Sequence, residues 1–396
     1  MITPFTKFQT QYQVNQTNMK WKIGFDAKRL FNNFTGLGNY SRSLLQNLPQ
    51  RNPDFEFHLY TPSINRELDS NYFQSDLFNV HLPASAINIA WRSFDISNDL
   101  IKDKIDLYHG LSNEIPFNFP KNKIKSVVTI HDLIFKIYPN TYPLVDRLIY
   151  NLKCKYACKH VDLILACSES SKNDICNFYS TNPDKIKVLY QSCNPEFKIQ
   201  KNSAHKKNIL DKYKLPNQFY LYVGSIEPRK NLLLLIEAYA QLHNDLKIPL
   251  VIVGKNAAFK HELLKKAEKL QLLNQIVYIH DLKSVQDLSA VYQSAEIFIY
   301  PSRYEGFGIP ILEAAFSKTA IITSNSSSLP EAGGPFCNYF NPDSSEELCF
   351  QIEKILTDEA FKKSSIEKTY KHAELHFNNA TIQNQLIQYY KNLLEI

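Results

Sequence analysis

Short apolar segments alternate with helical patterns along this chain, and the alternation occurs twice. In the first half, the expected strands are KIGFD, FEFHLY, IDLYHG, SVVTIHD and LILACS, at residues 22–26, 55–60, 105–110, 126–132 and 163–168. In the second half, they are FYLYVGS, PLVIVG, IVYIH, IFIYPS and AIITS, at residues 219–225, 249–254, 276–280, 297–302 and 320–324. Such alternation is typical of βαβ units and parallel sheets. The sequence therefore predicts an α/β fold with two doubly wound, Rossmann-like domains that face a cleft.

The polar stretch FKIQKNSAHKKN, at residues 197–208, separates the two halves. We expect an N-terminal domain over residues 19–200 and a C-terminal, ligand-binding domain over residues 201–375. A final helix is expected over 376–396, and packing back onto the N-terminal domain is one arrangement open to it. Residues 1–18 are rich in Gln, Thr and Asn, so we expect a poorly ordered extension, with Met19 as a candidate natural start.

The composition limits the classes of protein and ligand that are compatible with this chain. Of the 396 residues, 44% are hydrophobic, which is enough for two cores. The net charge of +6 suits phosphate-bearing ligands or an anionic membrane surface, and it is too small to indicate nucleic-acid binding. Seven cysteines without a CxxC pair argue against disulfides and structural zinc. Without a transmembrane-length apolar run or a signal-peptide core, a cytoplasmic protein is expected.

Glycine is scarce, with 10 residues in the chain, and most of them fall near the ends of expected strands or in turns. A glycine-poor sequence keeps glycine where a side chain would obstruct something or where φ is positive. For some positions ordinary turn chemistry is sufficient, namely Gly24, Gly254 and the pair Gly333–Gly334. For four others we expect close approach by a ligand, namely Gly36, Gly38, Gly306 and Gly308.

Two adjacent cations, Arg229 and Lys230, follow the first expected strand of the second half. They stand at a strand-to-helix turn, with Asn231 as the expected N-cap of the helix. Ligands of parallel sheets gather at the carboxyl ends of the strands. A guanidinium fork beside an ammonium group suits a diphosphate, although a solvated pair of loop residues is the simpler alternative. The position after a strand end favours the ligand site.

The segment IFIYPSRYEGFGIPILEAAF, at residues 297–316, places two acids around a glycine turn. Pro310 fits the first turn of a helix, so the backbone amides before it would point into the cleft and form an anion site. Glu313, one turn inside the helix, can accept hydrogen bonds from the vicinal hydroxyls of a ribose. A role in complementing the helix dipole would explain Glu313 but not Glu305 with its neighbouring glycines.

These residues carry a family resemblance. EGFGIPILEA resembles the Glu-x7-Glu motif of the retaining glycosyltransferases of family four, which have the two-domain glycosyltransferase B fold. FDAKRLFNNFTGLGNYSRSLL is similar to the N-terminal glycine loop of that family, and VVTIHDLIFKIYP to its His-Asp strand end. CSESSKNDI, GSIEPRKN and SNSSSLPEAGG match further blocks in family order. The His-Asp-Leu and Pro-Arg-Lys-Asn versions resemble bacterial mannosyltransferases that use GDP-mannose.

The resemblance implies roles for residues of the second half. Arg229 and Lys230 would hold the donor diphosphate, and Glu313 would bind the ribose. Glu305 would hold the transferred sugar, together with the backbone of Gly306, Phe307 and Gly308.

In the first half, the resemblance implies that Gly36 and Gly38 let their loop approach the diphosphate from the other domain. His131 would lie near the anomeric carbon of the sugar. For a lone histidine at a strand end, a satisfied structural role would be the better interpretation. The neighbouring Asp132 and the segment LIFKIYP that follows favour the site.

The expected activity is transfer of a hexose, namely mannose from GDP-mannose, to a saccharide or lipid-linked saccharide acceptor in cell-surface polysaccharide synthesis. A UDP-sugar donor remains an alternative, as does a sugar-nucleotide epimerase or a phosphorylase on the same fold. The chain contains no Asp-x-Asp motif, so we expect no metal and no cofactor, and cationic side chains would neutralise the leaving phosphate. We assign no covalent nucleophile, and Glu305 is the one candidate considered.

A membrane contact is a separate question, raised by YPLVDRLIYNLKCKYACKHVD at residues 142–162. Leu148, Ile149, Leu152 and Tyr156 recur there at helical spacing, and basic residues accompany them. A basic amphipathic helix can lie on an anionic bilayer, here the inner face of the plasma membrane. An ordinary helix that packs this stripe into the domain core is the alternative, and it is the arrangement we expect.

Overall fold

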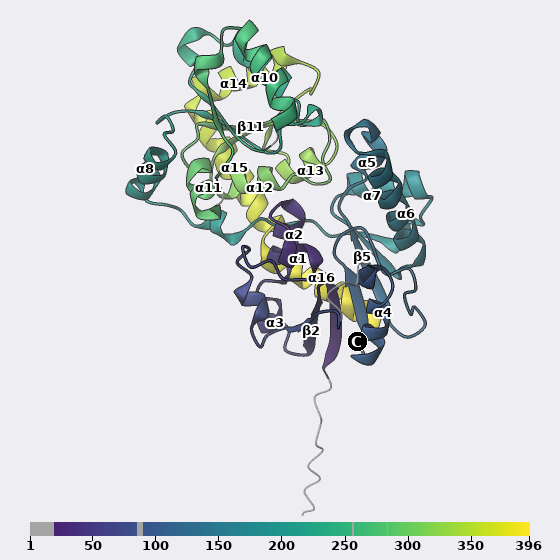
Figure 1. Ribbon diagram of the computed structural model, residues 1–396. Coiled ribbons are helices and arrows are strands. Elements are labelled where there is room, and N and C mark those ends of the chain that lie inside the picture. The colour runs from purple at the N-terminus through teal and green to yellow at the C-terminus, as the bar shows by residue number, and fades with distance from the viewer. Residues whose placement is uncertain (1–19, 85–89, 256, 283) are drawn as a thin grey trace, which may run out of the picture.

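The structure is a computed structural model that describes residues 20–84, 90–255, 257–282 and 284–396. The expected N-terminal extension, residues 1–18, and Met19 lie outside these residues. Two parallel β-sheets, each covered by helices, form the two halves of the molecule (Figure 1). The predicted fold class is confirmed.

The first sheet has seven strands in the order β3-β2-β1-β4-β5-β6-β7, and all its pairings are parallel. Its strands are β1 Trp21–Asp26, β2 Phe55–Tyr60, β3 Asn79–His81, β4 Leu107–Gly110, β5 Lys125–Ile130, β6 Leu163–Ala166 and β7 Ile186–Val188. Its helices are α1 Lys28–Asn32, α2 Gly36–Leu45, α3 Leu48–Arg51, α4 Ile96–Lys102, α5 Ile134–Ile137, α6 Leu144–His160 and α7 Glu169–Tyr179.

The second sheet has six strands in the order β10-β9-β8-β11-β12-β13, again all parallel. Its strands are β8 Tyr220–Val223, β9 Leu250–Val253, β10 Ile276–Ile279, β11 Ile297–Tyr300, β12 Ala320–Ser324 and β13 Asn338–Phe340. The remaining helices are α8 Ser203–Lys212, α9 Leu232–Gln241, α10 Ala257–Lys269, α11 Val285–Tyr292, α12 Ile309–Phe316, α13 Leu329–Gly333, α14 Ser345–Thr357, α15 Glu359–His376 and α16 Asn379–Leu394.

All ten predicted strands are present, and three further strands were missed. The missed strands are β3, β7 and β13, each of three residues and each at the edge of its sheet. Such short edge strands carry too little apolar pattern to be recognised, whereas the central strands are buried on both faces and read as continuous apolar runs.

Helices cover both faces of the first sheet, as the side chains of β6 illustrate. Leu163 and Leu165 belong to one buried cluster, whereas Ile164 and Ala166 belong to another. Because successive side chains of a strand point to opposite faces, the two clusters are the two cores of a doubly covered sheet. Ligands of such a covered sheet bind beyond the carboxyl ends of its strands.

The last helix, α16, leaves the second half of the molecule and packs on the first (Figure 1). Ile382, Leu386 and Tyr390 join the first sheet's core. The hydroxyl of Tyr390 lies 2.6 Å from Nδ1 of His109, a buried residue of β4. Residues 379–394 are therefore part of the N-terminal core, although they are the last helix in the chain.

Helix α6 differs from what we expected of it. The apolar stripe that was expected to pack in the core is exposed at Leu148, Ile149 and Leu152. The buried residues of the helix are instead Cys154, Ala157 and Cys158 on the opposite side. Small side chains allow the helix to lie close to its domain, so the larger residues remain outside.

Candidate active site

The order of the strands reverses between β8 and β11 in the second sheet. In open α/β sheets, ligands bind at such a switch point, beyond the carboxyl ends of the strands. Arg229 and Lys230 follow β8 in a short 3-10 turn, Pro228–Lys230, and Glu305 follows β11. Because β8 and β11 are paired neighbours, these residues meet although 75 positions separate Lys230 from Glu305.

The three charged side chains form one buried cluster. Nζ of Lys230 lies 2.5 Å from Oε1 of Glu305, and Nη1 of Arg229 lies 3.0 Å from Oε2. Each of the three residues is 7–9% exposed. Glu227 adds a second carboxylate, 2.7 Å from Nη2 of Arg229. The structure thus brings together the predicted diphosphate cations and the predicted sugar-binding acid.

The charge state of the cluster follows from its geometry. Burial opposes ionisation of Glu305, but Lys230 and Arg229 stabilise the carboxylate and hold its pKa at about 2. Burial also lowers the pKa of Lys230, and Glu305 offsets part of that effect. Both cations contact the same carboxylate, so we take all three groups as ionised at neutral pH. With Glu227, the cluster holds two cations and two carboxylates, so a phosphate bound at the end of the sheet would compete with these carboxylates for Arg229 and Lys230.

Two neighbours that the sequence did not single out hold Glu305 in place. The hydroxyls of Tyr300 and Ser302 donate to its Oε1 at 3.0 and 2.6 Å. Tyr300 also accepts from Nζ of Lys230 at 2.8 Å. Both are polar residues at the end of an apolar strand, which is the signal that could have identified them.

Glu313 lies apart from this cluster on α12. Its Oε2 accepts a hydrogen bond of 2.9 Å from the hydroxyl of Tyr292, on α11. Burial raises the pKa of Glu313 to about 7, and the bond from Tyr292 offsets part of that rise. Pro310 stands in the first turn of α12, as predicted. A carboxyl group at this pKa is poised to gain charge when hydroxyl donors approach it.

The imidazole of His131 is turned into the N-terminal domain. Its Nε2 donates to the carbonyl of Leu111 at 2.8 Å, and its Nδ1 accepts from Gln191 at 3.0 Å. Burial lowers its pKa to about 4, so the ring is neutral at pH 7, and only 6% of the residue is exposed. The side chain is therefore fully bonded within its domain, and the backbone of His131 faces the glycine turn.

The four glycines for which a ligand was expected have different surroundings. A Cβ at residue 306 would lie 2.2 Å from the carbonyl oxygen of His131, and a Cβ at residue 38 only 1.9 Å from that of Asn33. Gly308 has φ of +112° and would place a Cβ 3.0 Å from Leu329. Gly36 faces open space within 4 Å. The packing of the chain itself accounts for three of the four glycines, and Gly36 alone has room for an approaching group.

The two domains are joined at the same glycine turn. The carbonyl of Gly306 accepts hydrogen bonds from the hydroxyls of Ser168 and Ser171, at 2.6 and 3.2 Å. Nearby, the carboxylate of Glu331 accepts from the backbone amides of Glu169 and Ser170, at 2.7 and 2.9 Å. An acid at the N-terminus of α7 is favourable. The predicted site therefore contacts the first domain directly.

Other predicted neighbours differ in detail. Asn231 occupies the N-cap position of α9 with a left-handed backbone, φ of 60°, instead of the extended one typical of N-caps, and its side chain makes no cap. Its side-chain amide donates to the carbonyl of Pro342 at 2.8 Å. The ring of Phe307 stacks on Tyr190 with 5.6 Å between ring centroids, so only its backbone is available to a ligand. Asp132 is half-buried and lies close enough to Arg229 and Glu305 to interact electrostatically with both.

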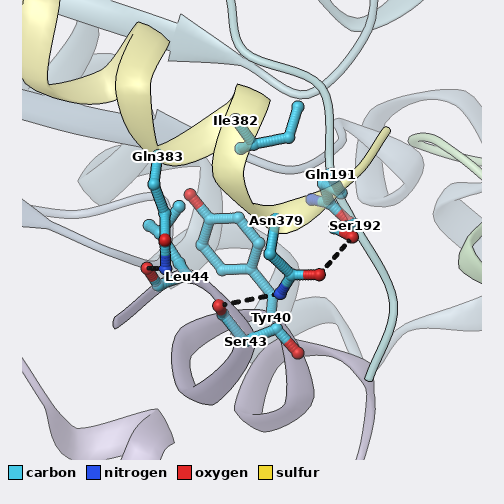
Figure 2. Close-up of a pocket in the computed structure, with 8 residues that line it drawn as sticks. All are labelled: Tyr40, Ser43, Leu44, Gln191, Ser192, Asn379, Ile382 and Gln383. Carbon is cyan, nitrogen blue, oxygen red and sulfur yellow. Dashed lines mark hydrogen bonds between the residues drawn. The ribbon is translucent and has the colours of Figure 1, made fainter. Parts of the chain in front are cut away.

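A small cavity of about 10 Å³ lies behind His131, between α2, α16 and the segment that joins the domains. Figure 2 shows Asn379 at its centre, bonded to the Ser43 carbonyl and the Ser192 hydroxyl. Gln191, which lines this cavity, is the partner of His131 Nδ1. The volume is at the lower limit for one water molecule, so the cavity supports the histidine and has no room for a sugar.

In the described part of the chain, no three His, Cys, Asp or Glu side chains are grouped as a metal ion would require. Metal independence remains a prediction. None of the described helices combines the length and hydropathy of a transmembrane segment.

Comparison with known families assigns both halves of the chain. The model described as Glycosyltransferase Family 4 matches residues 34–197, and that described as Glycosyl transferases group 1 matches residues 205–372. Among solved structures, a glycosyltransferase from Rickettsia africae superposes with a TM-score of 0.72 at 18% identity, covering 95% of this chain and 99% of that one. HepE from Anabaena, solved with UDP and glucose, gives 0.73 at 15% identity, covering 94% and 100%.

Curated relatives are similar in sequence. O-antigen chain mannosyltransferase B of Escherichia coli is 27% identical over 391 residues, which cover 94% of this chain and 100% of that protein. The serotype-specific mannosyltransferase WbdA of Escherichia coli is 32% identical over 266 residues, which are 65% of this chain. That match spans about a third of WbdA, namely 32% of its length. The chain belongs to glycosyltransferase family 4, has the glycosyltransferase B fold and resembles bacterial mannosyltransferases.

Proposed function

We propose that the protein is a hexosyltransferase that moves mannose from GDP-mannose, with retention of configuration, to a saccharide or lipid-linked saccharide acceptor. The relatives named as O-antigen mannosyltransferases support a role in the synthesis of a cell-surface polysaccharide such as O-antigen. The single observation that carries the proposal is the ionised cluster of Arg229, Lys230 and Glu305 at the switch point between β8 and β11.

The residues of this cluster suit departure of a nucleoside diphosphate. Negative charge grows on the leaving phosphate as the bond to the anomeric carbon breaks. Arg229 and Lys230 are already fixed by Glu305, so they need little reorganisation to stabilise that charge. Removing one such preorganised donor from other enzymes costs about 3–4 kcal/mol of transition-state stabilisation. No metal is required in this scheme.

Glu305 and Glu313 have different roles in the proposal. Glu313, on α12, would accept hydrogen bonds from the ribose of the nucleotide, and its raised pKa would fall when those donors bind. Glu305 would face the sugar, on which positive charge develops in the transition state. Glu305→Gln should therefore lower kcat with GDP affinity little changed, whereas Glu313→Gln should weaken GDP binding. The reverse pattern would contradict the placement of donor and sugar.

The experiment that tests the activity is a thermal-shift panel of GDP-, UDP- and ADP-sugars, followed by transfer assays with the sugar nucleotide that stabilises the protein most. GDP-mannose should give the largest shift, and transfer should persist in excess EDTA. The anomeric configuration of the product, measured by NMR, tests retention. Stabilisation by a UDP-sugar alone would favour the alternative donor.

Product analysis distinguishes the other reactions. An epimerase would change the sugar nucleotide without an acceptor, and a phosphorylase would consume inorganic phosphate. Loss of turnover in EDTA, with recovery on addition of Mg²⁺ or Mn²⁺, would contradict the metal-independent mechanism.

A further inference from the structure

Helix α6 presents large apolar side chains to solvent on successive turns. Leu144, Val145, Leu148, Ile149 and Leu152 are 44–66% exposed. On a helix, these positions fall on one continuous stripe, because residues three or four apart lie one above the other. The chain thus leaves a contiguous apolar face on the surface of its N-terminal domain, which is uncommon unless the face meets another surface.

The exposed face cannot be explained as a misplaced core face. The opposite side of α6 is buried through Cys154, Ala157 and Cys158. Nζ of Lys153 lies 2.6 Å from Oε2 of Glu114, and the hydroxyl of Tyr156 donates to the carbonyl of Phe117. These contacts fix the rotation of the helix about its axis, so the apolar stripe has no route into the domain.

Positive charge continues the same surface. Lys155 and Lys159 are exposed and follow the apolar stripe on the same side of the helix. At the end of α6, Lys121, Lys159 and Lys185 lie close enough to lower the pKa of His160, after the larger effect of its burial. The one acid within α6 is Asp146. An apolar stripe that ends in lysines is complementary to a bilayer with an apolar interior and anionic headgroups.

The helix is also linked to the end of the first sheet, where an acceptor would enter. Tyr150 packs against Phe135 and Tyr142, with ring centroids 6.1 and 6.2 Å apart, in the segment that follows His131. Glu114, the partner of Lys153, also binds Arg92. A surface that meets α6 would therefore lie beside the segment that follows His131.

We propose that α6 docks the protein on an anionic lipid bilayer, with residues 144–152 in the interface and the lysines of its last turns on the headgroups. The docking is a property of this surface and is independent of the transfer chemistry. Its link to a lipid-linked acceptor rests on the proposed function. Charge complementarity selects a membrane over a second copy of the chain, because α6 of a second copy would offer the lysines a single acid, Asp146, whereas anionic headgroups would pair with all of them.

Flotation of the full chain with vesicles tests the docking. Vesicles of phosphatidylcholine with phosphatidylglycerol should carry the protein at low salt, and vesicles of phosphatidylcholine alone should carry much less. Binding should fall as salt is raised, because exposed charges are screened. Absence of binding to the anionic vesicles at low salt would overturn the proposal.

Matched variants localise the contact. Leu148→Gln with Leu152→Gln, and separately Lys155→Gln with Lys159→Gln, should each lower partitioning by about tenfold or more. The controls are Phe350→Gln with Leu375→Gln, and Lys363→Gln with Lys371→Gln, at exposed positions on α14 and α15. Equal loss in variants and controls would overturn the assignment to α6, and thermal melting would check that each variant is folded.

Light scattering and a soluble-acceptor assay separate the remaining outcomes. A dimer that is lost in Leu148→Gln with Leu152→Gln, without vesicle binding by the parent, would assign the face to a second copy and contradict the proposal. Transfer to a soluble saccharide should be the same in the α6 variants and the parent. Vesicle binding without transfer activity would leave the docking intact and contradict the proposed function.

Discussion

Gly306 and His131 meet across the two domains, so that a Cβ at residue 306 would lie 2.2 Å from the carbonyl oxygen of His131. The neighbouring carbonyl of Gly306 is bonded to Ser168 of the first domain. The glycine turn that follows β11 is therefore both the proposed sugar site and a point where the two domains contact each other. Changes at this turn should weaken the contact between the two domains more than they weaken nucleotide binding.

Gly306→Ala should hold the domains apart, because the added carbon meets backbone that cannot rotate away. We expect kcat to fall by at least about tenfold, as for other displacements of reacting groups, while GDP affinity changes less. X-ray scattering should show a larger radius of gyration. Ser168→Ala is the control, since it removes the bond to the turn, together with the cap on the Ser171 amide at the start of α7, and adds no atoms. Normal kcat in Gly306→Ala would show that closure does not need this contact.

Gly36 and Gly38 form a second matched pair, at the start of α2. Gly38→Ala would place a Cβ 1.9 Å from Asn33 O, so the variant should lose about 1–3 kcal/mol of stability through overpacking. In Gly36→Ala, the added Cβ has no neighbour within 4 Å, so the variant should have the same melting temperature as the parent. If a donor approaches this loop, Gly36→Ala will nevertheless raise KM for the sugar nucleotide. Unchanged KM would remove Gly36 from the site.

The pairing of Lys230 with Glu305 should be visible in the free energy of unfolding. Lys230→Met leaves a buried carboxylate with one cation fewer, and breaking such a pair costs about 3–5 kcal/mol. Arg229 still contacts Glu305, so the lower end of this range is expected. In Lys230→Met with Glu305→Gln, the loss should be smaller than the sum of the two single losses. Urea denaturation of the four proteins measures this coupling, and strict additivity would contradict it.

The raised pKa of Glu313 predicts how the ligand-free protein responds to pH. Below pH 4.5 the carboxyl is protonated in both states, and up to about pH 7 the unfolded state loses its proton first. The free energy of unfolding should therefore fall as pH rises through this window, by about 1–3 kcal/mol. Glu313→Gln should lack this component, and Glu268→Gln, an exposed acid of α10, should retain it. Parallel stability profiles for the parent and Glu313→Gln would contradict the assignment.

Much of the site could be located from local patterns. Arg229, Lys230 and Glu305 follow strands that are recognisable as apolar runs, and parallel strands place their carboxyl ends at one edge. The hydrogen-bond partners of two other predicted site residues, His131 and Glu313, could not be predicted in this way. Gln191 bonds to His131 across 60 residues, and Tyr292 bonds to Glu313 from another helix. No local pattern in the sequence marks such pairs.

The sequence alone determined the fold class and the central strands, because apolar periodicity is set by which faces of an element are buried. The motif spacing likewise identified the family. Only the tertiary structure decided that the imidazole of His131 points into its own domain and that the apolar stripe of α6 faces solvent. It also showed that the packing of the chain itself requires three of the four glycines. The physical reason is the same in each case: periodicity shows that a residue has a preferred face, whereas long-range packing determines what that face meets.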